Sequence, residues 1–224
     1  MRQQDTRQAI LSAAEELFSQ KGFGAVALRE IAREARVNVG SVSYHFGDKL
    51  GILEAIYARH TRPMNERRME LIGEARRIPD RRQRLMAILR AYVLPAFSSS
   101  HDHAGGGARF TRMRAVLSAE GNTQAREIIA KSFDTTSRAF IDAILECLPG
   151  ADRDAVVWRS QFLLGSLYYA LINPERITRL SDGSVDGADH ERAIRETVEA
   201  SFASFEALAR PAEATATNRE ADPV

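Results

Sequence analysis

The chain has 224 residues and a mass of 24.9 kDa, which is enough for one large domain or two small ones. Its formal net charge is +1, and its 27% charged and 44% hydrophobic residues are typical of a globular protein rather than of a polyelectrolyte. The single cysteine excludes an internal disulfide framework and a zinc ribbon. We expect no secretory leader, and the longest uncharged stretch, residues 160–174, is shorter than the roughly 20 apolar residues of a membrane span. These features predict a soluble protein of the cytoplasm with no membrane partner.

Only 14 glycines and 7 prolines interrupt the chain, and this scarcity of helix breakers favours an all-α fold. In the N-terminal part, apolar residues recur three and four positions apart, which is the spacing of one face of an amphipathic helix. The pattern predicts four helices here, at residues 6–21, 28–35, 39–46 and 48–62. Gly22 and Pro63 end the first and the fourth, and Asn38 and Asp48 are good N-caps for the third and the fourth.

Longer helices follow, and we expect six of them, at residues 64–77, 80–98, 107–119, 122–148, 152–172 and 188–209. Between them lie breaks at Pro79, 98–107, Gly121, Pro149-Gly150 and 173–187. The chain then divides into an N-terminal domain over 1–47, linked by the helix 48–62, and a larger helical domain over 48–210. The tail 211–224 has no large apolar residue, so we expect it to be disordered.

Two features could carry other chemistry. His101 and His103 lie in a segment rich in serine and glycine, but zinc takes three or four ligands, so we interpret this segment as a mobile polar loop. We expect no metal site and no cofactor. Cys147 lies near a helix end, where a small buried core residue is a better interpretation than a redox-active thiol.

Two short helices joined by a three-residue turn and packed on a third have the layout of a helix-turn-helix domain, whose second helix enters the major groove of DNA. The spacing alone also fits other three-helix bundles, but the residues are more specific. The motifs are Thr6-Arg-x-x-Ile10-x-x-Ala-Ala14-x-x-Leu-Phe18, Gly22-Phe23, Leu28-Arg-Glu-Ile-Ala32-x-x-Ala35-x-Val37 and Val42-Ser-Tyr-His-Phe46-Gly-Asp-Lys49. Over residues 6–57 they resemble the N-terminal domain of the TetR (tetracycline-repressor-type) family of regulators.

The resemblance implies DNA contacts at particular positions. The residues that would face base edges are Arg29, Val39, Gly40 and Ser43, and those that would contact phosphates are Ser41, Tyr44, His45 and Lys49, with Arg36 as a further phosphate-seeking charge. Arginine can contact guanine through two hydrogen bonds, whereas hydroxyl and ammonium groups on phosphates fix the position of the protein without reading sequence.

Three residues depart from the family pattern. Ala27 stands where the second helix usually has a Ser or Thr cap. The absence of this cap lowers the stability of the helix by about 1 kcal/mol. Arg36 stands where the turn usually has glycine, and a side chain in the left-handed region costs about 1 kcal/mol. Ser43 replaces the usual tyrosine of the recognition helix, with Tyr44 one residue later.

The long helices carry most of the aromatic residues, and apolar pockets are commonly built between the helices of a bundle. We expect Phe110, Met113, Phe133, Phe162 and Tyr169 to line a ligand pocket, and Arg114 and Arg159 to be the candidates for a ligand carboxylate. A weaker likeness, in Trp158-Arg-x-x-Phe-Leu-Leu-Gly165, is to family members that sense acyl ligands.

A dimer is expected through the helices 152–172 and 188–209, the last two long helices, which the family uses as its dimer interface. The apolar residues that motivate it are Phe162, Leu163, Leu167, Ala170, Leu171, Ile194, Val198, Phe202, Phe205 and Leu208. They offer more apolar surface than one side of a small domain can hide.

Taken together, the sequence predicts an all-α homodimeric transcriptional regulator, a ligand-responsive repressor that binds a palindromic operator in double-stranded DNA and is released by a small, mainly apolar effector of acidic or acyl character. An enzyme with an active site inside a helical bundle is the alternative from another class. The chain has no Gly-rich phosphate loop, nucleophile elbow, His-Glu-x-x-His pair or carboxylate dyad, so we expect no enzyme. A DNA-binding protein without an effector is the third interpretation, and activation instead of repression also stays open.

Overall fold

The computed structural model describes residues 3–97 and 107–209. Within these ranges the chain is all-helical, as predicted, and contains no strand. The helices are α1 (Gln3–Ala25), α2 (Leu28–Glu34), α3 (Val39–Phe46), α4 (Lys49–Ala75), α5 (Arg81–Phe97), α6 (Gly107–Glu120), α7 (Thr123–Cys147), α8 (Arg153–Ile172), α9 (Pro174–Leu180) and α10 (His190–Glu206), followed by a 3-10 turn, η1 (Ala207–Ala209).

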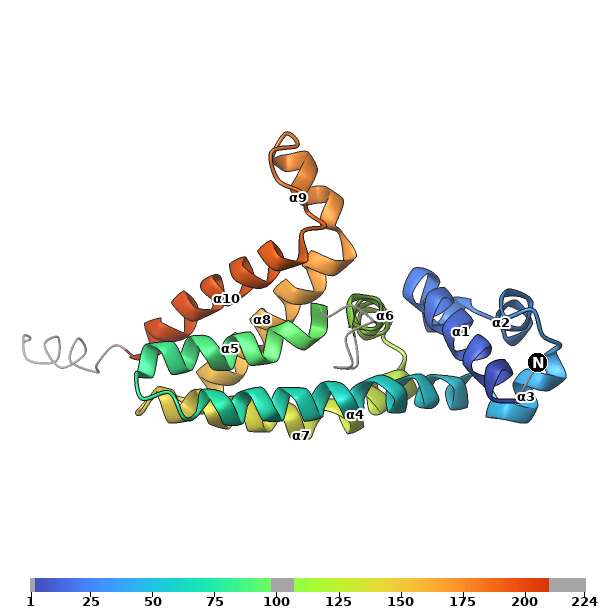
Figure 1. Cartoon of the computed structure of the whole chain (residues 1–224), viewed down its shortest axis with the longest axis horizontal. Coiled ribbons are helices and arrows are strands. Elements are labelled where there is room, and N and C mark those ends of the chain that lie inside the picture. The colour runs from blue at the N-terminus through green and yellow to red at the C-terminus, as the bar shows by residue number, and fades with distance from the viewer. Residues whose placement is uncertain (1–2, 98–106, 210–224) are drawn as a thin grey trace, which may run out of the picture.

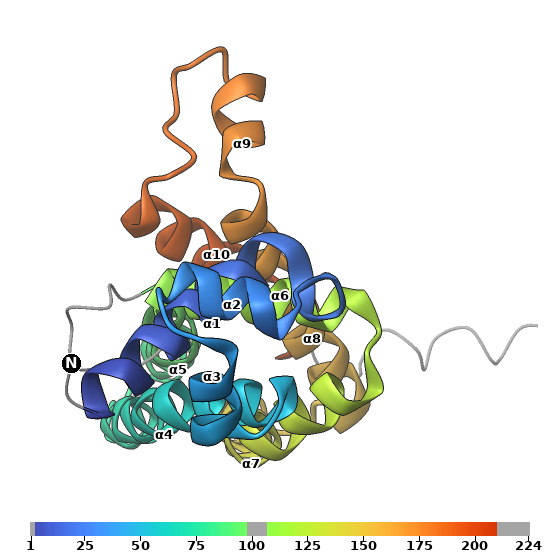
Figure 2. The ribbon, with the colours of Figure 1, turned by 90° about the vertical axis from the view of Figure 1, so that its right-hand side faces the viewer.

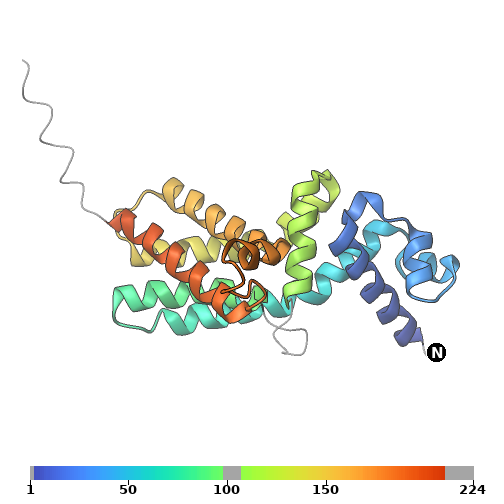
Figure 3. The ribbon, with the colours of Figure 1, turned by 90° about the horizontal axis from the view of Figure 1, so that it is seen from above.

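The molecule is elongated, with α1, α2 and α3 at one end (Figures 1 and 2). The long helices α4 and α7 lie side by side and run from this end into the body, where α5, α8 and α10 pack around them. Seen from above, α6 lies crosswise between the two parts, and α1 packs mainly against it (Figure 3). None of the described helices combines the length and the apolar character needed to cross a membrane.

Two hydrophobic cores fill the molecule. The first joins α1, α2, α3 and the beginning of α4 to α6 and α7, through residues such as Phe18, Ile56 and Phe110. The second joins the end of α4 to α5, α7, α8 and α10, through residues such as Ile72 and Phe140. Cys147 is fully buried in the second core, which confirms its interpretation as a core residue.

The prediction that Pro63 ends a helix is wrong. Residues 48–62 and 64–77 were expected as two helices, but Lys49–Ala75 is one helix with Pro63 inside it. Proline in a helix interior costs about 3 kcal/mol, because it removes a hydrogen bond and crowds the preceding turn. Burial on both sides of Pro63 offsets this cost, since Tyr57, Met64 and Ile72 are all buried on the same long face.

The other helix predictions differ less from the structure. The helices expected between residues 80 and 172 match α5 to α8 within one residue at each end. In α1, Gly22 interrupts the helical backbone with φ 80° and ψ 172°, as the sequence predicted, although helical hydrogen bonding resumes to Ala25. Helix α9 was missed, because 173–187 was interpreted as a break. Its signal was Pro174, which occupies the first turn, where proline is favoured.

Two predictions fall outside the described residues: the polar loop with His101 and His103, and the tail 211–224. In the ranges that are described, no three His, Cys, Asp or Glu side chains come together in a way that could hold a metal ion.

Two of the departures from the family pattern lie on either side of α2, one directly before the helix and one in the turn between α2 and α3. Ala27, at the N-cap of α2, makes no side-chain capping hydrogen bond. Arg36 has φ 56°, in the left-handed region, as expected for a position that usually holds glycine. The turn is held by backbone hydrogen bonds from Arg36 N to Arg33 O (3.1 Å) and from Val37 N to Ala32 O (2.9 Å). The hydrogen bonds of its neighbours therefore hold Arg36 in a backbone conformation that is unfavourable for a residue with a side chain.

We predict that Arg36→Gly raises the free energy of unfolding by about 1 kcal/mol, because glycine adopts this φ without the clash of a Cβ atom. Arg36→Ala is the matched control, since it also removes the charge but keeps the Cβ atom. Urea unfolding of the two variants measures the difference. Equal midpoints for Gly and Ala would contradict the strain at this position.

Candidate nucleic-acid interface

Helix α3 presents one exposed face to solvent. Val39, Gly40, Ser43 and Tyr44 are exposed, and the 76% exposure of Tyr44 excludes a core role for this ring. On the opposite side Val42 is fully buried and holds α3 on the first core. Four of the residues implied by the resemblance therefore share a single free surface of α3.

Arginines extend this surface onto α2 and the turn. Arg29, Arg33 and Arg36 are exposed, and none of them forms an ion pair within the described part of the chain. The nearby carboxylate of Glu30 is bound instead by Lys21, whose ammonium group lowers the pKa of Glu30 below its ordinary value. These arginines are consequently available to an external anion.

Ser41 and His45, two other residues predicted to contact DNA, are half-buried. Asn38 caps α3, because its Oδ1 atom accepts hydrogen bonds from Ser41 N (2.7 Å) and from the Ser41 hydroxyl (3.0 Å). In this structure the hydroxyl of Ser41 donates to the cap. His45 lies beside Tyr44, with 5.3 Å between the ring centroids, at the edge of the exposed face.

Lys49, which is also expected to contact phosphate, lies against the segment between α1 and α2. Its Nζ atom donates to the carbonyl oxygens of Phe23 (2.6 Å), Val26 (2.8 Å) and, at longer distance, Gly24 (3.4 Å). It also lies 4.4 Å from the centroid of the Phe23 ring. All three donors of the ammonium group are used inside the protein, so in this structure Lys49 fixes the segment between α1 and α2.

The same segment is held from its other side by Glu120, at the end of α6. Its carboxylate accepts hydrogen bonds from Phe23 N (2.8 Å) and Gly24 N (2.5 Å). A Cβ atom on Gly24 would lie 2.7 Å from Glu120 Oε1, so a larger residue here would require the carboxylate to shift. This contact between residues 96 and 97 positions apart was missed, and no local pattern could have indicated it.

The expected ligand residues separate into two groups. Phe110, Met113, Arg114 and Phe133 come together and are buried between α4, α6 and α7. The other members do not join them, which corrects the prediction. Phe162 and Tyr169 are 60% and 55% exposed on α8, and Arg159 Nε donates to the carbonyl oxygen of Ser204 at 3.0 Å. Helical spacing did not tell which face of α8 is inside.

Arg68 joins the buried group and was missed. It is 1% exposed on α4, and its Nε atom donates to the carbonyl oxygen of Tyr92 at 3.0 Å. The signal was its position, because it follows Met64 and precedes Ile72 by four residues on the buried face of the helix. Because the sequence-based prediction ended the helix at Pro63, it did not place Arg68 on the same buried face as Tyr57.

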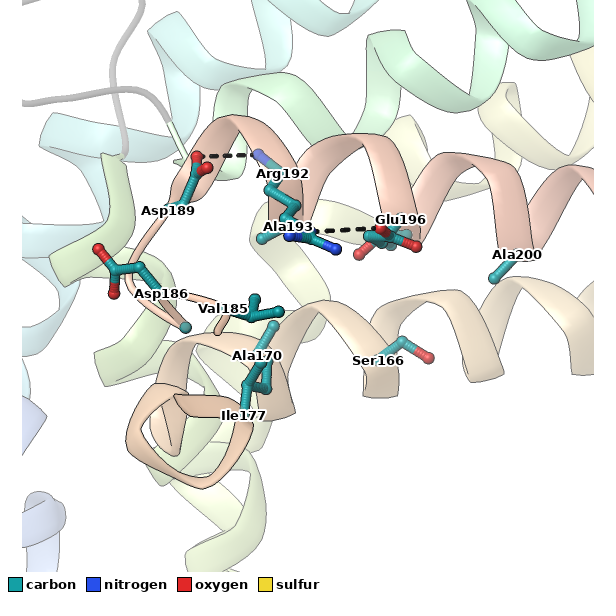
Figure 4. Close-up of a pocket in the computed structure, with 12 residues that line it drawn as sticks. Ser166, Ala170, Ile177, Val185, Asp186, Asp189, Arg192, Ala193, Glu196 and Ala200 are labelled. Carbon is teal, nitrogen blue, oxygen red and sulfur yellow. Dashed lines mark hydrogen bonds and ion pairs between the residues drawn. The ribbon is translucent and has the colours of Figure 1, made fainter. Parts of the chain in front are cut away.

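A groove of about 460 Å³ lies elsewhere, between α8, α9 and α10 (Figure 4). Ser166 and Ala170 line one side and Arg192 and Glu196 the other, with Ile177 of α9 at one end. None of the residues expected to bind a ligand lines it.

The apolar surface expected for a dimer also needs correction. Six of the residues that motivated it are buried in the second core: Leu163, Leu167, Leu171, Ile194, Val198 and Phe205. The exposed apolar side chains of α8 are instead Val157, Trp158, Phe162 and Tyr169. Trp158, Phe162 and Tyr169 follow one another along a single face of the helix, where Gly165 is also exposed, whereas Val157 lies to the side of this face.

Comparison with known proteins gives the same assignment to both parts of the chain. A family model described as "Bacterial regulatory proteins, tetR family" matches residues 10–56, and one described as "Tetracyclin repressor-like, C-terminal domain" matches residues 90–203. The HTH-type transcriptional repressor BepR of Brucella suis is 44% identical over 62 residues, which are 28% of this chain and 30% of the relative. The matches to the first curated relatives cover less than a third of their lengths.

Solved structures resemble nearly the whole chain at low sequence identity. The fatty acid degradation regulator FadR from Bacillus halodurans has a TM-score of 0.58 and 14% identity, with 88% of this chain and 94% of that chain covered. A TetR-family protein from a Rhodococcus species has a TM-score of 0.59 and 18% identity, with 92% and 99% covered. These two share the fold, and the second family model covers half of the sequence. The chain therefore belongs to the TetR family of bacterial regulatory proteins.

Proposed function

We propose that this protein is a DNA-binding transcriptional regulator of the cytoplasm, a homodimeric repressor that binds an inverted repeat and is released by a small, mainly apolar effector. The observation that carries the proposal is the exposed face of α3, with Val39, Ser43 and Tyr44. Beside it lie Arg29 and Arg36, which form no ion pair with any residue that the structure describes. A helix with a free face of this size can enter the major groove, and arginines at its edge can contact bases and phosphates.

A two-fold dimer supports this mode of binding, since two recognition helices must meet successive major grooves. The exposed stripe of α8, Trp158, Phe162 and Tyr169, is the apolar surface that favours self-association. Gly165 lies within the stripe and would let two helices approach closely. An isologous contact through this stripe needs no other partner.

We predict that Phe162→Glu converts the protein to a monomer at micromolar concentration, because two carboxylates would face each other across the two-fold axis. Light scattering measures the mass. Tyr44→Glu adds the same charge at another exposed aromatic position, away from α8, and should leave the mass unchanged. A monomeric wild-type protein would contradict the proposed dimer.

Two arginine variants should separate base recognition from phosphate contact. Arg29→Ala should relax the preference for one base pair in each half-site, at a cost of about 1–3 kcal/mol in discrimination. Arg36→Gly should weaken binding to all sequences alike and reduce the slope of log K against log salt by about 1.8 for the dimer, or about 0.9 per protomer. Anisotropy titrations on a duplex selected by the protein from a random pool measure both effects.

The selected duplex should contain an inverted repeat with half-sites about 34–36 Å apart, or a multiple of that distance. If neither arginine variant changes the affinity or its salt dependence, the protein does not use this face on DNA.

A direct set of contacts connects the helices around the proposed effector site to the DNA-binding end. Glu120 of α6 and Lys49 of α4 hold the same segment, one through its amides and the other through its carbonyls. This segment leads directly into α2. A change in the position of α6 relative to α4 would therefore move α2 and α3, and an effector that favours such a state would lower DNA affinity.

We predict that Glu120→Ala lowers the free energy of unfolding by about 1 kcal/mol, a modest value because the carboxylate is partly in solvent. The amides of Phe23 and Gly24 should then exchange hydrogen faster, since they lose their acceptor. Glu127→Ala, at an exposed position of α7, is the matched control and should change neither quantity. Unchanged exchange at both amides would contradict the proposed connection.

A further inference from the structure

Side chains from several helices meet around the buried ring of Phe133 on α7. The guanidinium carbon of Arg114, on α6, lies 3.8 Å from the centroid of this ring, and that of Arg68, on α4, lies 5.8 Å from it. The ring of Tyr57, also on α4, lies 6.4 Å from the same ring, centroid to centroid. Two arginines and a phenol are thus collected in one small region of the interior.

The two guanidinium groups have no carboxylate partner in the described part of the chain. Arg68 and Arg114 are 1% and 3% exposed, yet neither forms an ion pair. Glu15 is the one buried acid among the described residues, and its carboxylate is bound by His60 Nε2 at 2.8 Å. Buried charges in proteins are nearly always paired, so this positive pair is unusual.

Hydrogen-bond donors are also left over at this place. Arg68 Nη1, Arg114 Nε and the Tyr57 hydroxyl are all shielded from solvent and have no hydrogen-bond partner among the described residues. Nearly all buried donors in native proteins have an acceptor. Here three donors have no acceptor, and they lie on two helices that face the same aromatic ring. This arrangement indicates a place for an external acceptor.

The ionisation of neighbouring groups reflects the same excess of positive charge. Burial lowers the pKa of Arg68 to about 10, and the nearby Arg114 lowers it as well, while Tyr92 opposes the shift. Burial would raise the pKa of Tyr92, but Arg68 and Arg114 outweigh it and the pKa falls below its ordinary value. Burial would lower the pKa of Arg114, but Tyr168, Tyr92 and Tyr57 outweigh it and the pKa rises above its ordinary value. Among the described residues, the charged form of Arg114 is thus held by phenol groups alone, and a negative charge is favoured beside it.

We propose that Arg68 and Arg114, with the Tyr57 hydroxyl, bind the carboxylate of an effector that has a single negative charge and an apolar body. This inference rests on the proposed function as an effector-responsive regulator and names the chemical class of that effector. The apolar part of the molecule would lie against Phe110 and Met113, which are fully buried beside the same cluster.

The number and the type of donors favour a carboxylate over a phosphate. A guanidinium group matches the two oxygen atoms of a planar carboxylate, and three free donors are sufficient for one such group. A phosphate monoester carries up to two charges and three strong acceptor oxygens, and a buried site with three free donors would leave part of it unsatisfied.

The test compares acids with neutral molecules of the same body. Decanoate and 3-phenylpropionate are titrated against decanol and 3-phenylpropanol by calorimetry on the full-length protein, and decyl phosphate is included as the competing anion. At least one acid should bind ten times more tightly than its alcohol and more tightly than decyl phosphate. If neither acid exceeds its alcohol, or if only decyl phosphate binds, the proposal is overturned.

Variants distinguish binding from a structural role. Arg114→Met should weaken the binding of the acid at least tenfold and raise the melting temperature of the ligand-free protein, because a buried charge that has no carboxylate partner among the described residues is replaced by an apolar side chain. Tyr57→Phe removes only a hydroxyl group and so preserves the fold, and it should weaken the acid severalfold. A lower melting temperature of Arg114→Met, with unchanged acid binding, would show a purely structural arginine and overturn the proposal.

DNA binding is measured on the same samples, so that the two proposals can fail separately. A protein that binds the selected duplex but no acid keeps its proposed function and loses this inference. A protein that binds an acid through Arg114 but no DNA keeps the anion site and loses the proposed function.

Discussion

The structure depends on one continuous helix, α4, whose buried face belongs to both hydrophobic cores. Ile52 and Ile56 pack in the first core and Ile72 in the second, on either side of Pro63. Each such side chain contributes about 1.5–3 kcal/mol when fully buried, so a few of them offset the cost of about 3 kcal/mol that proline imposes on a helix interior. Because this one helix passes through both cores, the end of the molecule formed by α1, α2 and α3 cannot change its position unless α4, or the α6 that packs on α1, moves with it.

Local sequence patterns predicted the elements whose boundaries are set locally. Helix α3 begins and ends where Asn38 and the spacing of Val42 and Phe46 indicate, and Gly22 breaks α1 as expected. Pro63 shows the limit of this reasoning, since its effect is decided by packing far along the chain. Burial was harder still: Phe162 and Leu163 are neighbours of similar hydrophobicity, yet only Leu163 is inside.

The candidate sites divide in the same way. The exposed residues of α3 could be predicted because the helix-turn-helix is a short local unit with a specific pattern. The role of Lys49 could not, since its acceptors belong to a segment 23 to 26 residues earlier that α6 also holds. Arg114 was predicted as a ligand contact, whereas its companion Arg68 was hidden in a charged stretch that is normally solvated.

Two arginines occupy positions where other residue types would make the folded protein more stable. Arg36 adopts a strained φ, and glycine would make the fold more stable at this position. Arg114 carries a buried charge, and an apolar side chain would make the fold more stable there. In both places an anion would supply the missing interaction, at the surface from DNA and in the interior from the proposed effector. The interior pair also spans two helices, since Arg68 belongs to α4 and Arg114 to α6. An anion between them would replace repulsion by attraction between the two helices that hold the DNA-binding end.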